Sequence, residues 1–232
     1  MTRSAAAGNE RLAIVIPTLD EELALPAALA GALRLADEVV VSDGGSRDRT
    51  LEIARSAGAT LVSGPPGRGG QLNRGAAATA AGILLFLHAD TALPDDAATA
   101  VRAALARGAP GGGFRIAFDS SLLRMRLAAR LINARTALSA TPLGDQALFV
   151  GRAAFDALGG FAPWPILEDL DFAWRLRRLG KPAILRGPAV TGARRFLGRG
   201  VARTVSTNWL IWSLFFCGVE PERLARLYRN IR

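Results

Sequence analysis

The sequence is poor in cysteine and histidine. Cys217 is its only cysteine and His88 its only histidine among 232 residues. A single cysteine excludes an intramolecular disulfide framework, and one cysteine with one histidine excludes the usual zinc sites, which take several such ligands. Because chains without disulfides are typical of reducing compartments, we expect a cytoplasmic protein.

Long apolar runs are also missing. The most apolar segment, residues 208–219, is well short of the ~20 residues that a membrane-spanning helix needs. It could pack on the core, form a homodimer contact, or lie on a bilayer through Trp209 and Trp212, so a homodimer and peripheral contact with an anionic inner membrane face both stay open. Residues 1–11 are small and polar without a signal-peptide core, and we expect a disordered tail there.

Lysine is nearly absent, since Lys181 is the only one among 29 basic residues. The charge is unevenly spread: residues 1–112 carry 10 basic and 12 acidic residues, whereas residues 113–232 carry 19 and 8. The second half is therefore expected to bind anions or to face an anionic surface. With 50% apolar residues, the chain is long enough for one sizeable core, which predicts a single domain.

Strand and helix patterns alternate along the first 90 residues. Apolar, β-rich runs recur between helical stretches, at residues 12–16, 37–43, 59–63 and 83–87. This alternation predicts an α/β fold with right-handed crossovers and a mostly parallel sheet. Ligands bind beyond the carboxyl ends of such strands, so Glu21, Asp43 and Asp90, which follow three of them, are expected to converge on one rim.

The segment GPPGRGGQLNRG, residues 64–75, combines five glycines with Arg68 and Arg74. It matches neither the P-loop nor the G-x-G-x-x-G dinucleotide fingerprint. We expect a flexible, cationic turn beside the ligand edge, followed by a helix over residues 71–81. A surface loop with two solvated arginines is the alternative.

Two helices of the second half have distinctive patterns. Over residues 122–138 an apolar stripe is flanked by arginines, which is typical either of an interfacial helix or of a packed surface helix; the stripe holds Leu123, Leu127, Leu131, Ala134 and Leu138. Glu168, Asp169 and Asp171 open a second helix, whose Phe172, Leu176 and Leu179 are expected to face inward. The helix dipole favours acids there by ~0.3–1 kcal/mol each, so capping alone could explain them.

Several motifs occur together in a fixed order. They are PTLDEE at residues 17–22, VSDGGSRDRT at 41–50, GRGGQLNRG at 67–75, LHAD at 87–90, LGGF at 158–161 and EDLDFAWRLRRLG at 168–180. On these motifs the chain resembles the family 2 glycosyltransferases of GT-A fold. Within the family it most resembles a small bacterial subgroup associated with radical-SAM and selenium-domain genes, whose members carry HAD and GDQ.

The resemblance implies a Rossmann-like, mostly parallel but mixed central sheet flanked by helices. The GT-A domain would cover residues 12–195, with a nucleotide-binding half at 12–112 and an acceptor and catalytic half at 113–195. Residues 196–232 would add C-terminal helices to this single domain.

The resemblance also implies an activity: inverting transfer of a sugar from a nucleotide-diphosphate sugar to an acceptor hydroxyl. Asp90 takes the place of the family's metal-contacting acid, for Mg²⁺ or Mn²⁺. His88 replaces the first Asp of the family's D-x-D motif, which leaves its role open. The other residues expected to contact the donor are Pro17, Thr18, Glu21, Asp43, Arg68 and Arg74.

In the second half, the resemblance places Asp145 and Gln146 at the sugar or acceptor, with an ordinary Asp-turn as the alternative. Asp169 is the expected general base, although Glu168 could take that role instead. Many relatives have a His near residues 194 and 195, where this chain has Arg194 and Arg195. These arginines could bind the diphosphate or be solvated.

Two other functions fit the sequence less well. A nucleotidyltransferase has a similar sheet but would want a Gly-rich signature with Arg and Lys after the first strand, where PTLDEE is acidic. A basic protein that binds RNA or a membrane surface without catalysis would give no reason for acids at three strand ends. We therefore expect no nucleic-acid partner.

Overall fold

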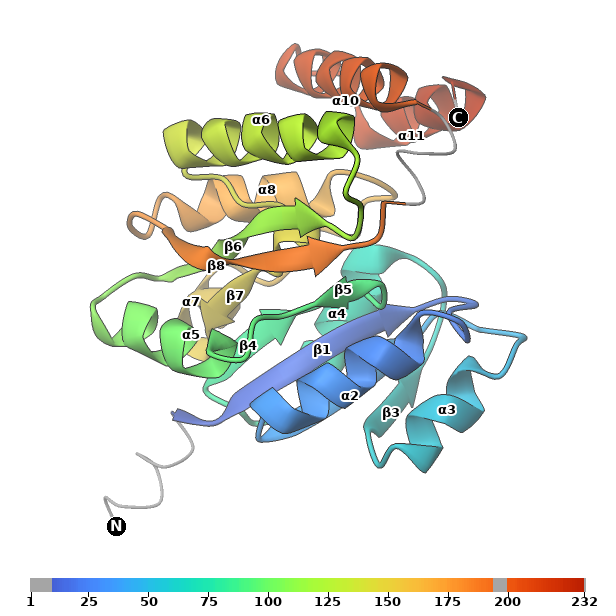
Figure 1. Ribbon diagram of the computed structural model, residues 1–232, viewed down its shortest axis with the longest axis vertical. Coiled ribbons are helices and arrows are strands. Elements are labelled where there is room, and N and C mark those ends of the chain that lie inside the picture. Colours follow the sequence, from blue (N-terminus) through green and yellow to red (C-terminus); the bar gives the residue numbers. More distant parts are fainter. Residues whose placement is uncertain (1–9, 194–199, 232) are drawn as a thin grey trace.

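The structure is a computed structural model that describes residues 10–193 and 200–231. An eight-stranded mixed sheet forms its centre, in the order β3-β2-β1-β4-β7-β6-β8-β5, with helices on both faces (Figure 1). The expected α/β architecture, a mixed central sheet flanked by helices, is confirmed. Most of the tail expected at residues 1–11 lies outside the described residues.

The first half of the chain builds the parallel part of the sheet. Its strands β1, β2, β3 and β4 are parallel to one another; they cover Leu12–Thr18, Glu38–Asp43, Thr60–Ser63 and Ile83–Phe86. The connecting helices α2, α3 and α4 span Leu25–Leu35, Thr50–Ser56 and Arg68–Ala77. Because parallel strands end at the same edge, the loops after β1, β2 and β4 meet there.

The second half completes the sheet with antiparallel and parallel pairs. Strand β7 (Phe149–Gly151) runs antiparallel to β4 and to β6 (Gly111–Phe118), and β8 (Ala183–Thr191) lies parallel to β6. The short β5 (Thr91–Ala92) closes the order against β8. The helices of this half are α5, α6, α7 and α8, at Ala97–Ala106, Leu123–Ser139, Arg152–Ala157 and Glu168–Leu176.

Each face of the sheet has its own apolar core. Alternate residues of β1 point to opposite faces, so Ile14 packs under α2 and α5 while Val15 packs under α4 and α8. The second core contains four neighbouring aromatic rings, of Phe86, Phe155, Phe161 and Phe172. Fully burying one such side chain contributes roughly 1.5–3 kcal/mol, so these two cores fix the strand ends that carry the site.

Three boundaries differ from the sequence expectation. Helix α4 begins at Arg68 rather than at residue 71, so Arg68 sits on the first helical turn and not in a flexible loop. The sequence predicts a short strand over residues 181–187, whereas β8 extends to Thr191, four residues further. Phe172 and Leu176 are buried as expected, but the expectation for Leu179 is wrong, because α8 ends at Leu176 and Leu179 lies half-exposed in the turn beyond it.

Two C-terminal helices, α10 (Val201–Phe216) and α11 (Pro221–Ile231), lie beside α6 (Figure 1). None of the helices in the described part of the chain has the length and hydropathy needed to span a membrane. On α6, the side that packs on the sheet consists of small or flexible residues, namely Met125, Ala128, Ala129 and Thr136. The leucine stripe therefore faces away from the core, and α6 packs on the sheet through its opposite side.

Candidate active site

Two adjoining cavities lie beyond the strand ends. The first, the sheet-edge cavity, has a volume of 510 Å³ and is lined by the ends of β1 and β4, the start of α4, and Thr191 and Gly192 at the end of β8. The second, the helix-side cavity, has 450 Å³ and lies between the start of α8 and helices α10 and α11. Four residues line both cavities: Arg68, His88, Asp145 and Asn208.

The sheet-edge cavity collects most of the residues expected to bind the donor. Pro17 and Thr18 end β1, Glu21 follows in the next loop, and His88 and Asp90 follow β4. Of the three acids expected on one rim, Glu21 and Asp90 line this cavity. Parallel pairing of β1 with β4 places these two loops side by side.

Asp43 and Arg74 are not among the residues that line either cavity. Burial alone would raise the pKa of Asp43, but hydrogen bonds from the Ser46 hydroxyl and backbone, the Gly45 N–H and Thr18 hold that pKa below its usual value. The carboxylate therefore shapes the loop after β2. The Arg74 guanidinium donates to the Pro65 carbonyl at 2.8 Å, under the glycine-rich turn.

Sequence reasoning did not single out Gln71. Its buried Nε2 donates to the carbonyls of Thr18 at 2.8 Å and Ser42 at 3.0 Å, and its Oε1 accepts from the Gly67 N–H at 3.2 Å. These bonds tie α4 to the ends of β1 and β2 and thereby fix the floor of the sheet-edge cavity. The one available signal was its place three residues after Arg68, on the same face of the helix.

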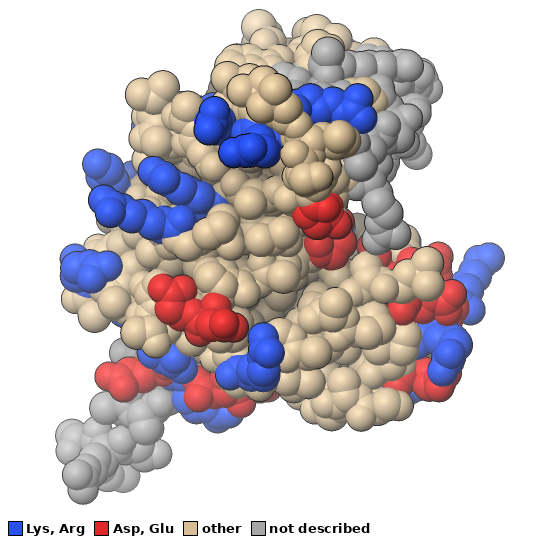
Figure 2. Space-filling view, in the orientation of Figure 1, with Lys and Arg blue, Asp and Glu red and all other residues tan. Residues whose placement is uncertain are grey.

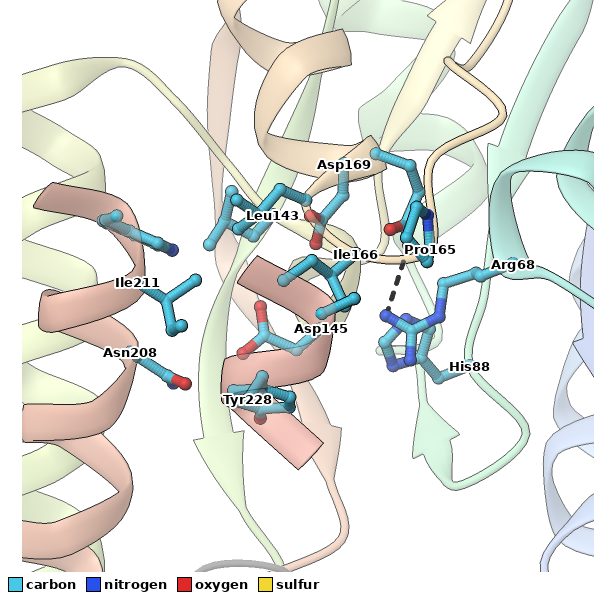
Figure 3. A pocket seen from close by; sticks show the side chains of 14 residues that line it. Arg68, His88, Leu143, Asp145, Pro165, Ile166, Asp169, Asn208, Ile211 and Tyr228 are labelled. Atoms are coloured by element: carbon cyan, nitrogen blue, oxygen red, sulfur yellow. Dashed lines mark hydrogen bonds and ion pairs between the residues drawn. The ribbon is translucent and has the colours of Figure 1, made fainter. Parts of the chain in front are cut away.

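Arg68 and Glu168 connect the two halves of the domain. The Arg68 Nη1 lies 3.4 Å from Glu168 Oε1, across 100 positions of sequence (Figure 3). Glu168 is only 2% exposed, and burial together with the neighbouring Asp169 charge raises its pKa to about 7. Burial lowers the pKa of Arg68, but Glu168, Asp169 and Asp145 outweigh it, so the pKa of Arg68 is raised and the guanidinium stays charged.

Asp169 lies on the first turn of α8, a helix that begins directly after a strained residue. Leu167 has φ 65°, a left-handed conformation that costs a non-glycine residue about 1–3 kcal/mol. Oδ2 of Asp169 accepts from the Gly144 N–H at 2.8 Å, and Oδ1 accepts from the Leu170 N–H at 2.8 Å. These two bonds orient the carboxylate along the wall of the helix-side cavity.

Gly144 lies between His88 and Asp169. A Cβ at this position would lie 2.9 Å from His88 Nε2 and 3.1 Å from Asp169 Oδ2. A side chain at the first position of the GDQ motif would therefore collide with the histidine ring and crowd the carboxylate. Glycine at this position leaves both side chains in place, and His88 lies at the boundary of the two cavities.

Asp145 and Gln146 point in opposite directions. Asp145 lines both cavities, and its Oδ1 is buried without a hydrogen-bond partner among the described residues. Gln146 is fully buried and lines neither cavity: Nε2 donates to the Phe114 carbonyl at 3.0 Å, and Oε1 accepts from Thr136 Oγ1 at 2.9 Å. Gln146 thus anchors the loop, whereas Asp145 presents a carboxylate to the cavities (Figure 3).

Asp90 is the residue of the sheet-edge cavity that suits a hard metal ion. Its carboxylate is exposed, and a Cβ at Gly192 would lie 3.0 Å from Oδ2, so the missing side chain leaves space beside this oxygen. Within residues 10–193 and 200–231, no three His, Cys, Asp or Glu side chains cluster as a metal site. A bound Mg²⁺ or Mn²⁺ would take one protein carboxylate, with its other oxygens from ligand and water, which fits these ions. Arg194 and Arg195, expected at the diphosphate, lie outside the described residues.

Comparison with known proteins shows the family to which the chain belongs. Residues 13–152 match the family described as glycosyl transferase family 2. The chain belongs to this family. It is therefore a glycosyltransferase, and the expected GT-A fold class is confirmed. No curated protein matches the chain.

Solved structures of other proteins share the fold. Staphylococcus aureus TarS, as its 1–349 fragment, superposes with a TM-score of 0.63 at 16% identity, over 84% of this chain and 64% of that one, less than two thirds of its length. Glucosyl-3-phosphoglycerate synthase from Mycobacterium tuberculosis, in complex with Mn²⁺, UDP and phosphoglyceric acid, gives 0.58 at 25% identity, over 81% and 72%. Its complex with Mn²⁺ and UDP-glucose gives 0.58 at 26%, over 82% and 71%.

We expect Asp145→Asn to stabilise the folded glycosyltransferase at about pH 8 and to lose this effect near pH 4. Burial raises the pKa of Asp145 from 3.8 to about 6. The folded state therefore binds this proton more tightly than the unfolded state, and ionisation costs stability as the pH rises from about 4 to about 6 and remains costly above that. The neutral amide removes a cost on the order of 1–3 kcal/mol.

Thermal unfolding of both proteins across this pH range measures the effect. Asp156→Asn, which removes a carboxylate from the exposed surface of α7, is the control for a simple change of net charge. A difference between Asp145→Asn and the parent that is the same at every pH would contradict the assignment.

Proposed function

We propose that this family 2 glycosyltransferase inverts the anomeric centre as it moves a sugar from a nucleoside diphosphate to an acceptor hydroxyl. One observation supports this above the others: the cavity with Asp169 adjoins the cavity with Asp90, and Arg68, His88, Asp145 and Asn208 form their common wall. A donor in the sheet-edge cavity can thus present its sugar to an acceptor in the helix-side cavity.

The donor would lie in the sheet-edge cavity with its nucleotide against Pro17, Thr18 and Glu21. The complexes of the M. tuberculosis synthase with UDP and with UDP-glucose support a nucleotide sugar as the donor class. Arg68 would face the diphosphate, because its raised pKa keeps the positive charge at the junction of the cavities. Asp43 would act on the base only through the loop that it holds.

Asp169 would act as the general base. Its carboxylate takes the proton from the acceptor hydroxyl while that oxygen bonds to the anomeric carbon and the bond to the diphosphate breaks. Because attack and departure occur on opposite faces, the configuration inverts and no protein nucleophile is needed. Glu168 is less suited, since it is almost completely buried and ion-paired with Arg68, whereas Asp169 is partly exposed on the cavity wall.

Asp90 would hold the divalent metal, and the space beside Gly192 would admit it. A bound Mg²⁺ or Mn²⁺ supplies Lewis-acid stabilisation of the charge that develops on the departing diphosphate. The synthase complexes with Mn²⁺ support this cofactor class. Arg68 adds a fixed positive charge from the protein side.

The acceptor would be a hydroxyl compound with an apolar portion. The described lining of the helix-side cavity combines the apolar side chains of Leu143, Ile166 and Ile211 with the carboxylates of Asp145 and Asp169 (Figure 3). The unpartnered Oδ1 of Asp145 suits a hydroxyl donor, and buried polar atoms gain most from such a bond.

We further infer that the enzyme is cytoplasmic. Its membership of the subgroup associated with radical-SAM and selenium-domain genes stays a prediction.

A donor panel tests this function. Nucleoside diphosphates and their sugars should bind in calorimetry, more tightly with Mn²⁺ than with a chelator, and one donor should give nucleoside diphosphate release that depends on an added hydroxyl acceptor. A folded protein that binds no nucleotide would overturn the proposal. Pyrophosphate release from a nucleoside triphosphate would instead identify a nucleotidyltransferase.

A further inference from the structure

Helix α6 exposes a continuous apolar stripe to solvent. Leu123, Leu127, Leu131 and Leu138 are between 47% and 90% exposed, and they lie on the side opposite the residues that pack on β6. The spacing of three or four residues between successive apolar positions, counting Ala134, puts them on one face of the helix. Leucines exposed in a row, rather than singly, mark an interaction surface.

Helix α10, which lies beside α6, also exposes large apolar side chains. Trp209, Leu210 and Phe216 are each exposed by 46% or more. The two helices are joined where the Arg135 guanidinium of α6 lies 4.8 Å from the centre of the Trp212 ring of α10. The leucine stripe and these three side chains together are the outer face of the α6–α10 pair.

The same two helices carry only positive charge. Arg124, Arg126, Arg130 and Arg135 lie on α6, and neither α6 nor α10 contains an aspartate or a glutamate. On the helical wheel the leucine stripe runs between Arg124 on one side and Arg126 and Arg130 on the other. In Figure 2 the surface over these two helices shows Lys and Arg but no Asp or Glu.

We propose that the outer face of the α6–α10 pair binds the surface of an anionic lipid bilayer. Leucine and tryptophan side chains would enter the boundary between headgroups and acyl chains, and the arginines would extend to lipid phosphates on both sides of the stripe. A second copy of the chain fits less well, because pairing this face with itself would bring arginines together with no acidic partner. This inference is independent of the proposed glycosyl transfer.

Binding in this orientation would also place the acceptor cavity at the bilayer. Helix α10 presents Asn208, Ile211 and Trp212 to the helix-side cavity while it exposes Trp209 to solvent. One helix therefore separates the proposed lipid surface from the proposed acceptor site. An acceptor with an apolar portion can reach that cavity from the membrane surface.

Co-sedimentation of the full chain with vesicles tests the inference. The protein should bind phosphatidylcholine vesicles that contain phosphatidylglycerol, bind pure phosphatidylcholine weakly, and lose binding as salt is raised. Leu127→Glu with Leu131→Glu should abolish binding. Arg126→Gln and Arg130→Gln should each weaken binding to the anionic vesicles roughly fivefold. Leu33→Glu, on an exposed position of α2, is the matched control and should bind as the parent does.

Circular dichroism and nucleotide affinity of each variant show that the fold and the donor site are intact. A folded parent protein that ignores anionic vesicles would overturn the inference. So would a concentration-dependent dimer, seen by light scattering, that Leu127→Glu with Leu131→Glu dissolves while vesicle binding is absent. Equal binding to neutral and anionic vesicles would show that the arginines do not recognise lipid charge.

Discussion

Replacing Asp169 by Asn is expected to lower the rate of sugar transfer by about 10²–10⁴-fold while donor affinity stays nearly unchanged. The amide keeps the shape of the carboxylate but does not accept a proton from the acceptor hydroxyl. Asp169 lines the helix-side cavity and not the sheet-edge cavity, so the donor should not sense the change. Transfer rates at saturating donor, together with calorimetry of the nucleoside diphosphate, measure the two effects separately.

Two neighbours on the same helix serve as controls for Asp169. Glu168→Gln tests the alternative base, and we expect a smaller loss of transfer because Glu168 chiefly positions Arg68. Asp171→Asn removes the ion pair with Arg175, in which Nη2 of Arg175 lies 2.6 Å from Oδ2 of Asp171. This variant should leave the rate of transfer close to that of the parent. A larger loss in Glu168→Gln than in Asp169→Asn would exchange the two roles, and loss of donor binding in Asp169→Asn would exclude it as the base.

The parallel half of the fold was predictable from local sequence. The apolar runs of β1, β2 and β4 are buried on both faces, and polar residues follow each of them at the shared sheet edge. Glu21 and Asp90 could be placed at one edge because both directly follow parallel strands. The glycine-rich segment was harder, since the same residues suit a loop or the first turn of α4.

The orientation of α6 was not predictable in the same way. Periodicity shows which residues share a face but not what that face contacts. The helix packs with Met125, Ala128 and Ala129 because small side chains let it approach β6 closely, and this leaves the larger leucines outside. A pattern rule that buries the larger residues would choose the wrong face.

Residues of the helix-side cavity were missed for a different reason. Trp212 and Tyr228 come from helices that follow the last motif, and they meet Asp145 only through long-range packing. The neighbours Asp145 and Gln146 were treated alike, although the backbone of a short helical turn sends one into the cavity and the other into the core. Such distinctions depend on tertiary contacts that no local pattern contains.

Asp90→Asn is expected to remove the metal-dependent part of nucleotide binding and to slow transfer by about 10²–10³-fold. The amide carries no negative charge to bind a hard cation. Metal stabilisation of the transition state is worth several kcal/mol, and each tenfold change in rate corresponds to about 1.4 kcal/mol. The variant should fold as the parent does, since Asp90 is exposed and the hydrogen bond that its carboxylate accepts from the Thr91 hydroxyl is long, at 3.4 Å. Calorimetry of UDP with Mn²⁺ and with a chelator measures the metal-dependent part directly.

Gly192→Ala tests the same site without removing the carboxylate. Its Cβ would come within 3.0 Å of Asp90 Oδ2, and the backbone there needs no positive φ, so the methyl group should crowd the metal while the chain still folds. We expect a metal-dependent affinity between those of the parent and Asp90→Asn. Asp95→Asn, on a freely exposed carboxylate, should bind UDP and Mn²⁺ as the parent does. If Mn²⁺ leaves UDP affinity of the parent itself unchanged, Asp90 holds no metal and the diphosphate is bound by cationic side chains such as Arg68.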